Sequence, residues 1–143
     1  MRQFALIVVC MACVAACARQ PDVDVIRHAI VDAGAAAAAQ RSSDVLAHVS
    51  DDFIGNDGEL VRTQLASMLR VQMLTKRGID VRLGHIDVQL DADRATAHFD
   101  ATLTDASGHW LEDRSSTLHF DTGWRRERSV WRCYNAHWSR VTP

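Results

Sequence analysis

The spacing of apolar residues changes at Gly78, and this change sets the class of fold. Before Gly78, apolar residues recur every three or four positions, which is the period of an amphipathic helix. After Gly78 they alternate with polar residues, which is the period of a strand with one buried face. Helices followed by a run of alternating strands predict an α+β domain.

Two helices are predicted in the first third of the chain. The first covers about residues 23–40, where Ile26 and Ile30 recur at helical spacing before an alanine-rich stretch that favours helix. Its apolar face is shallow, so we expect it to pack closely against a neighbour. The second helix is short: it begins at the capping sequence Ser42-Ser43-Asp44 and ends near Ser50.

A third helix is predicted between a turn and Gly78. Phe53-Ile54 predicts a brief strand, and Asn56-Asp57-Gly58 is a strong turn signal. The helix that follows covers about residues 60–76, with a glycine stop at its end. We expect its apolar stripe to pack on the concave face of the sheet, and this stripe consists of Leu65, Met68, Leu69 and Met73.

Four long strands are predicted after the helices. The first covers residues 79–90, and its parity changes at Gly84-His85, which predicts a β-bulge. The others cover about 95–103, 118–124 and 130–140. Consecutive strands of this kind form an antiparallel meander. The sequence therefore predicts three N-terminal helices packed on an antiparallel sheet of four long strands plus the short strand near residue 53.

The N-terminus predicts export and a lipid anchor. Arg2 precedes an apolar segment, residues 4–14, that is too short to span a bilayer, which needs about 20 residues. Val14-Ala15-Ala16-Cys17 resembles the lipobox of bacterial lipoproteins, which implies cleavage before Cys17 and acylation of that residue, for example with palmitate. The alternative is an ordinary secretory signal with a chance cysteine.

This interpretation divides the chain into a signal peptide at 1–16, a lipidated tether at 17–22 and one domain at 23–140. Ala18 stands where many proteins retained at the inner membrane have aspartate, so we expect an outer-membrane anchor with the domain facing the periplasm. Cys10 and Cys13 leave with the signal peptide. Only Cys133 then remains in the domain, where a buried, inert thiol is predicted rather than a nucleophile.

Charge and motif content exclude several functions. The formal net charge of −2 offers no broad basic surface for nucleic acid. The sequence lacks a metalloprotease helix, a phosphate-binding glycine loop, a nucleophile elbow and paired-cysteine motifs. We therefore predict no cofactor.

Two tripeptides are the sharpest candidates for a chemical site: His98-Phe99-Asp100 and His119-Phe120-Asp121. Residues two apart on a strand share a face, so each tripeptide presents an imidazole and a carboxylate together. Such ligands could hold a divalent metal if the two pairs face each other. The preferred interpretation turns both phenylalanines to the core and the polar residues to solvent, and no metal site is predicted.

The last strand carries the candidate ligand-binding residues. Tyr134 and Trp138 are expected to share one strand face with Ala136, as a pocket wall or as core. Nearby, Arg125-Arg126-Glu127-Arg128 is the main basic cluster. It is interpreted as a solvated turn, with contact to an anionic lipid or polymer as the functional alternative.

Two segments carry a family resemblance. The turn and helix start at Asp52–Gly58, followed in order by the last strand Val130–Trp138, resemble the nuclear transport factor 2-like superfamily, which includes ketosteroid isomerase-like and polyketide cyclase-like members. The resemblance spans about residues 23–140. It implies a cone in which a curved antiparallel sheet wraps helices around a pocket, and it implies that the domain can pair sheet to sheet as a homodimer.

The resemblance leaves two functions open, because this cone serves enzymes, ligand binders and scaffolds. The favoured prediction is a non-enzymatic module that binds a small apolar ligand or an envelope protein through Tyr134 and Trp138. The alternative is a cofactor-independent isomerase, cyclase or hydratase. Its general base would be His98, Asp100 or His119, although no position matches a family motif for this role.

Overall fold

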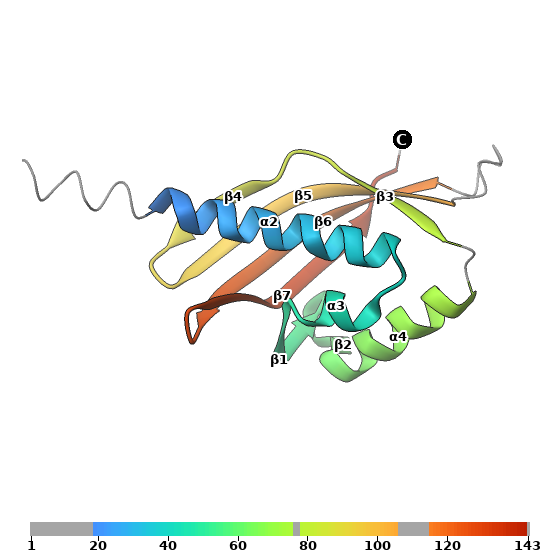
Figure 1. The fold of residues 1–143 in the computed structure, drawn as a ribbon, viewed down its shortest axis with the longest axis horizontal. Helices are drawn as coiled ribbons and strands as arrows, with labels where there is room; N and C mark the ends of the chain where they lie inside the picture. Colours follow the sequence, from blue (N-terminus) through green and yellow to red (C-terminus); the bar gives the residue numbers. More distant parts are fainter. Residues whose placement is uncertain (1–18, 76–77, 106–114, 143) are drawn as a thin grey trace, which may run out of the picture.

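The structure is a computed structural model that describes residues 19–75, 78–105 and 115–142. The α-helices within these described residues are α2 (Arg19–Ala38), α3 (Ser42–Leu46) and α4 (Arg62–Thr75). Helix α2 runs across the sheet, whereas α3 and α4 lie beside its β1–β2 end (Figure 1). We call the face under α2 the covered face and the opposite one the open face.

Seven strands form one mixed sheet in the order β2-β1-β7-β6-β5-β3, with β4 also paired to β5. Their bounds are β1 Val49–Gly55, β2 Leu60–Val61, β3 Ile79–Leu83, β4 Asp87–Asp91, β5 Arg94–Asp105, β6 Ser115–Glu127 and β7 Val130–Arg140. The α+β class and the helix-then-strand order are confirmed. The sheet has more strands than predicted and is not purely antiparallel, because β1 pairs with β7 in parallel.

The predicted strand at 79–90 is two strands. Residues 79–83 pair with the far half of β5, and residues 87–91 pair with its near half. The break at Gly84-His85-Ile86 lies where the parity change predicted a bulge, and Gly84 N–H donates to Asp100 O there at 2.8 Å. Both pieces therefore cover one edge of β5, each in its own register.

The core lies between α2 and the covered face. Ile26 is fully buried, and Ala36 is also buried. Close approach is possible because the side chains are small: a Cβ on Gly34 would lie only 3.2 Å from Leu83 Cδ1. The alanine-rich face thus packs closely, as predicted. The helix begins at Arg19, four residues earlier than expected, with Pro21 in its first turn, where proline is tolerated.

Helix α4 contributes less to the core than its apolar stripe predicted: of that stripe, Leu65 packs against the core cluster from a partly buried position. Leu65, Leu69 and Met73 are only half-buried, and Met68 is exposed. The helix contacts α3, β1 and β2 and so lies at an edge of the sheet. Amphipathic spacing identified the helix correctly but could not say how fully its apolar stripe is covered.

A bulge in β7 separates Tyr134 from Trp138, which corrects the prediction that they share a face. Gly123 pairs with Asn135 and Trp124 pairs with Cys133, so Tyr134 is the extra residue. Its ring lies on the open face over Gly123, where an added Cβ would be 3.1 Å from Tyr134 Cζ. Beyond the bulge the parity is reversed, and Trp138 points to the covered face.

Cys133 is a buried free thiol, as predicted. Burial raises its pKa to about 12, so the thiolate is not formed at neutral pH. The predicted signal peptide and Cys17 lie outside the described residues. Within the described segments, no helix has both the length and the apolar character required to cross a membrane.

Candidate functional site

Three aromatic side chains on the covered face form the candidate ligand-binding surface. Phe99 and Phe120 are paired across β5 and β6 and stack with ring centroids 5.2 Å apart and an interplanar angle of 11°. Trp138, opposite Phe120 on β7, continues the row at 6.1 Å and 35°. We call Phe99, Phe120 and Trp138 the aromatic row.

The aromatic row is only half-buried because the helices do not close over it. Helix α2 contacts β3 and β4, and α4 contacts β1 and β2. At its β1 end, the row packs against Gly55, where a Cβ would lie 3.2 Å from Trp138 Cζ3. The main-chain N–H of Trp138 donates to Asn56 Oδ1 at 3.2 Å, so the predicted turn also positions this strand.

Within the part of the chain that the structure describes, the covered face around the aromatic row has no paired acid and base. Among the side chains that the structure describes, inward positions of β5–β7 are apolar apart from Thr122, Ser116 at the far end, the Cys133 thiol and the terminal Arg126 and Arg140. The Thr122 hydroxyl donates to Ala97 O at 2.9 Å and accepts from Trp124 Nε1 at 2.9 Å. The Thr122 hydroxyl therefore already has protein partners for its proton and for one lone pair. This surface offers stacking and apolar contact rather than proton transfer.

The candidate general bases lie on the open face. His98 pairs with Asp121 and Asp100 pairs with His119 in the strand register, so the two tripeptides do face each other. Their side chains are between 41% and 54% exposed. A base for chemistry inside the cone must reach the covered face, and His98, Asp100 and His119 point the other way. In the described part of the chain, no group of three or more His, Cys, Asp or Glu is arranged to hold a metal.

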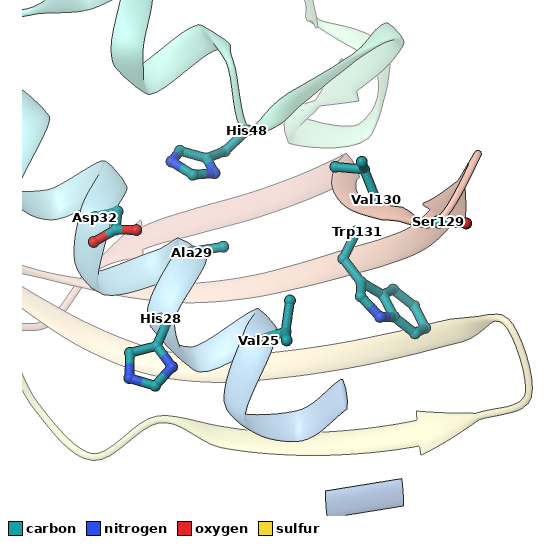
Figure 2. Close-up of a pocket in the computed structure, with 8 residues that line it drawn as sticks. All are labelled: Val25, His28, Ala29, Asp32, His48, Ser129, Val130 and Trp131. Atoms are coloured by element: carbon teal, nitrogen blue, oxygen red, sulfur yellow. The ribbon is translucent and has the colours of Figure 1, made fainter. Parts of the chain in front are cut away.

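A groove of about 410 Å³ opens between α2 and the start of β7. Figure 2 shows Val25 and Ala29 of α2 facing Val130 and Trp131 of β7 across it. Its polar lining residues are His28, Asp32, His48 and Ser129. Among these described residues, no hydrogen bond or ion pair joins an imidazole to Asp32. The groove is therefore an open surface feature without a formed acid–base pair.

Sequence reasoning missed this groove and most of the aromatic row. The four-residue spacing of His28 and Asp32 places both on one side of a helix, which is a signal that could have been noticed. His48 enters from the segment between α3 and β1, and only the folded chain brings it there. The alternation predicts Phe99 and Phe120 as core, whereas the structure leaves both half-exposed.

Comparison with known proteins identifies the fold. No protein-family model matches the sequence, and no curated protein matches it by sequence. Among solved structures, an NTF2-like protein of unknown function from Pseudomonas putida superimposes with a TM-score of 0.75 at 17% identity, over 87% of this chain and 89% of that chain. The fold is that of NTF2-like proteins.

Two further NTF2-like structures carry candidate activities. A candidate dehydratase of the NTF2-like family from Streptomyces avermitilis matches with a TM-score of 0.73 at 13% identity, over 87% of this chain and 99% of that chain. A candidate scytalone dehydratase from Novosphingobium aromaticivorans matches with a TM-score of 0.71 at 12% identity, over 86% of each chain. The resemblance inferred from Asp52–Gly58 and Val130–Trp138 is thus confirmed for the fold, and identities this low carry no activity.

Proposed function

We propose that the protein is a lipid-anchored cell-envelope protein whose NTF2-like domain binds a small apolar ligand on the aromatic row. The observation that supports this is the half-buried row of Phe99, Phe120 and Trp138 on a face whose described residues include no acid–base pair. Half-buried aromatic rings retain apolar surface that a ligand can cover, at about 25 cal/mol for each Å² removed from water. An envelope protein that inserts an apolar side chain is the alternative occupant.

The structural neighbours include candidate dehydratases and a candidate aromatic ring hydroxylase. Those descriptions belong to those proteins. For this chain, the residues named as general bases occupy the open face, about the thickness of the sheet away from a ligand on the aromatic row. The proposal is therefore a binding role rather than catalysis.

Trp138→Ala is expected to weaken binding of the apolar dye Nile red about two- to ten-fold, because one aromatic pair is worth about 0.5–1.5 kcal/mol. The measurement is a fluorescence titration of the full chain in a mild non-ionic detergent. Tyr134→Ala is the matched control, since it also removes an aromatic ring, but from the open face. Equal losses in both variants, or an unchanged affinity in Trp138→Ala, would contradict the proposed site.

The anchor part of the proposal rests on Cys17, which stands two residues before the start of α2. Two residues span at most about 7 Å, so an acylated Cys17 would hold the domain against the membrane surface. Two or more acyl chains, at about 0.8 kcal/mol per buried methylene, give stable attachment.

Cys17→Ser is expected to move the protein from the membrane fraction to the soluble periplasm, or to leave the precursor uncleaved. Cell fractionation with an antibody to the domain measures the first outcome, and the apparent mass measures the second. Cys13→Ser is the control, because this cysteine lies within the segment expected to be removed. Unchanged membrane attachment and normal processing of Cys17→Ser would rule out acylation as the anchor.

A further inference from the structure

The open face carries a charged cluster that the proposed ligand site does not use. His98 Nδ1 lies 2.6 Å from Asp121 Oδ1, and His119 Nδ1 lies 2.6 Å from Asp100 Oδ1. His119 also reaches Asp121 with its second ring nitrogen, Nε2, at 3.2 Å from Oδ1. One imidazole therefore contacts two carboxylates, one on each of β5 and β6.

The two contacts of His119 depend on how many protons its imidazole carries. A neutral imidazole has one N–H donor, and an ionised carboxylate only accepts. If His119 donates to Asp100, its other nitrogen can donate to Asp121 only when the ring is doubly protonated. In the neutral ring, one nitrogen would instead direct a lone pair at a carboxylate oxygen. Both contacts are favourable only in the imidazolium form.

On the same face of the sheet, the neighbouring strands β4 and β7 place one more carboxylate and one more imidazole next to this cluster. In the strand register, Asp87 of β4 lies opposite His98, and His137 of β7 lies opposite Asp121. Ser139 lies opposite His119, and Arg82 belongs to the next row of the sheet on β3. Across β4, β5, β6 and β7, four paired residues on the open face therefore lie side by side: Asp87, His98, Asp121 and His137.

We propose that His119 is a pH-operated clamp between β5 and β6: its doubly protonated ring holds Asp100 across on β5 and Asp121 on its own strand, and loss of one proton leaves one of these carboxylates without a donor. Phe120 follows His119 in the chain and points to the covered face. The clamp therefore lies next to the Phe99–Phe120 pair in the strand register, on the opposite face of the sheet. Above the transition the two strands are held by their backbone ladder, by the His98–Asp121 contact and by the remaining contact of His119.

The direction of the effect follows from both partners. The hydrogen bond to Asp100 raises the pKa of His119 against the opposing effect of its desolvation, so the stabilisation is complete below the ordinary histidine pKa of about 6.5 and is lost as the pH rises through the folded-state value. The pKa of Asp121 is lowered, chiefly by the His98 hydrogen bond, so its stabilisation is lost in acid. The cluster therefore stabilises most between about pH 4 and pH 6.5.

An NMR titration of the histidine ring protons in the full chain in detergent tests the clamp. His119 is expected to titrate with a midpoint above about 6.5, and Asp100→Asn is expected to bring that midpoint down. His28, on the exposed side of α2, serves as the internal reference and should not respond to Asp100→Asn. A His119 midpoint at or below 6.5, or one that Asp100→Asn leaves unchanged, would overturn the proposal.

Melting temperatures measured at several pH values distinguish a titrating clamp from a side chain of His119 that only packs. The melting temperature of the wild type should exceed that of His119→Gln most in mildly acidic buffer, and this difference should shrink as the pH rises to 9. Glutamine keeps a hydrogen-bonding side chain but cannot titrate. A difference that stays constant with pH would make His119 a packing residue and would overturn the clamp. His28→Gln, at an exposed position on α2, is the matched control for replacing a histidine by glutamine.

Discussion

Ile26→Asp is expected to abolish folding, whereas Leu69→Asp is expected to be tolerated. Ile26 is 0% exposed in the core between α2 and the sheet. An unpaired carboxylate buried there costs several kcal/mol, against a total stability of about 5–15 kcal/mol. Leu69 is half-buried on α4, so its carboxylate can remain in water at a cost of about 1 kcal/mol. Circular dichroism melts of both variants of the full chain measure the contrast.

A milder change at the same position makes the test quantitative. Ile26→Ala removes only apolar atoms, and the expected loss is about 2–5 kcal/mol, because the cavity left behind collapses incompletely. Val31→Ala, at an exposed position on the same helix, should change stability by less than about 0.5 kcal/mol. If Leu69→Asp unfolded the protein while Ile26→Asp did not, the assignment of the core to α2 would be wrong.

Sequence periodicity predicted the elements of this fold better than their partners. The change at Gly78 separated helices from alternating strands, and the bounds of α4 and β7 lie within two residues of their predictions. The parallel pairing of β1 with β7 could not be predicted in this way, because it joins residues about 80 positions apart. Within β1, Asp51 and Asp52 also interrupt the apolar run that identifies a strand.

The candidate site was predicted in part, and one bulge explains the main error. Alternation places Tyr134 with Trp138 only if the strand is regular, and the extra residue in β7 reverses the parity between them. Trp138 therefore belongs to the aromatic row, whereas Tyr134 lies between Arg94 and Arg125 on the open face, with each guanidinium carbon 5.2 Å from its ring centroid. The side of the sheet on which the two tripeptides place their His and Asp residues was predicted correctly, because β5 and β6 are regular over their shared register.

Arginines of the basic cluster at the end of β6 form ion pairs with acidic residues of the same chain. Three oxygens surround the two N–H groups of Arg125 Nη2: Asp52 Oδ1 at 2.7 Å, Glu127 Oε1 at 2.9 Å and Ser50 Oγ at 2.9 Å. Arg126 pairs with Asp22 and stacks over Trp131, with its guanidinium carbon 5.0 Å from the ring centroid. Two of its three arginines are thus already paired with acids, which argues against attraction of this cluster to an anionic lipid or polymer.

Arg125→Met is expected to lower the free energy of unfolding at neutral pH, because it leaves hydrogen-bonding partners without a donor. Ser50 is 1% exposed, and its single hydroxyl proton cannot serve Asp52 and Glu127 at once. Methionine keeps much of the arginine stem's volume, so the loss reports the guanidinium. Chemical denaturation of the full chain in detergent measures it, with Arg70→Met on the exposed side of α4 as control.

Acid should erase most of the difference between Arg125→Met and the wild type. The Arg125 hydrogen bond is the largest cause that lowers the pKa of Asp52, to about 2, and the Ser50 and Arg125 hydrogen bonds lower that of Glu127. A carboxyl whose folded pKa is lowered stabilises the fold above its ordinary pKa, near 4, and loses that contribution as the pH falls through the folded value. The two proteins should therefore differ most above pH 5 and converge towards pH 2. A stability difference that persists unchanged at pH 2 would mean that Arg125 acts through packing against Tyr134 rather than through the carboxylates that join β1 to β6.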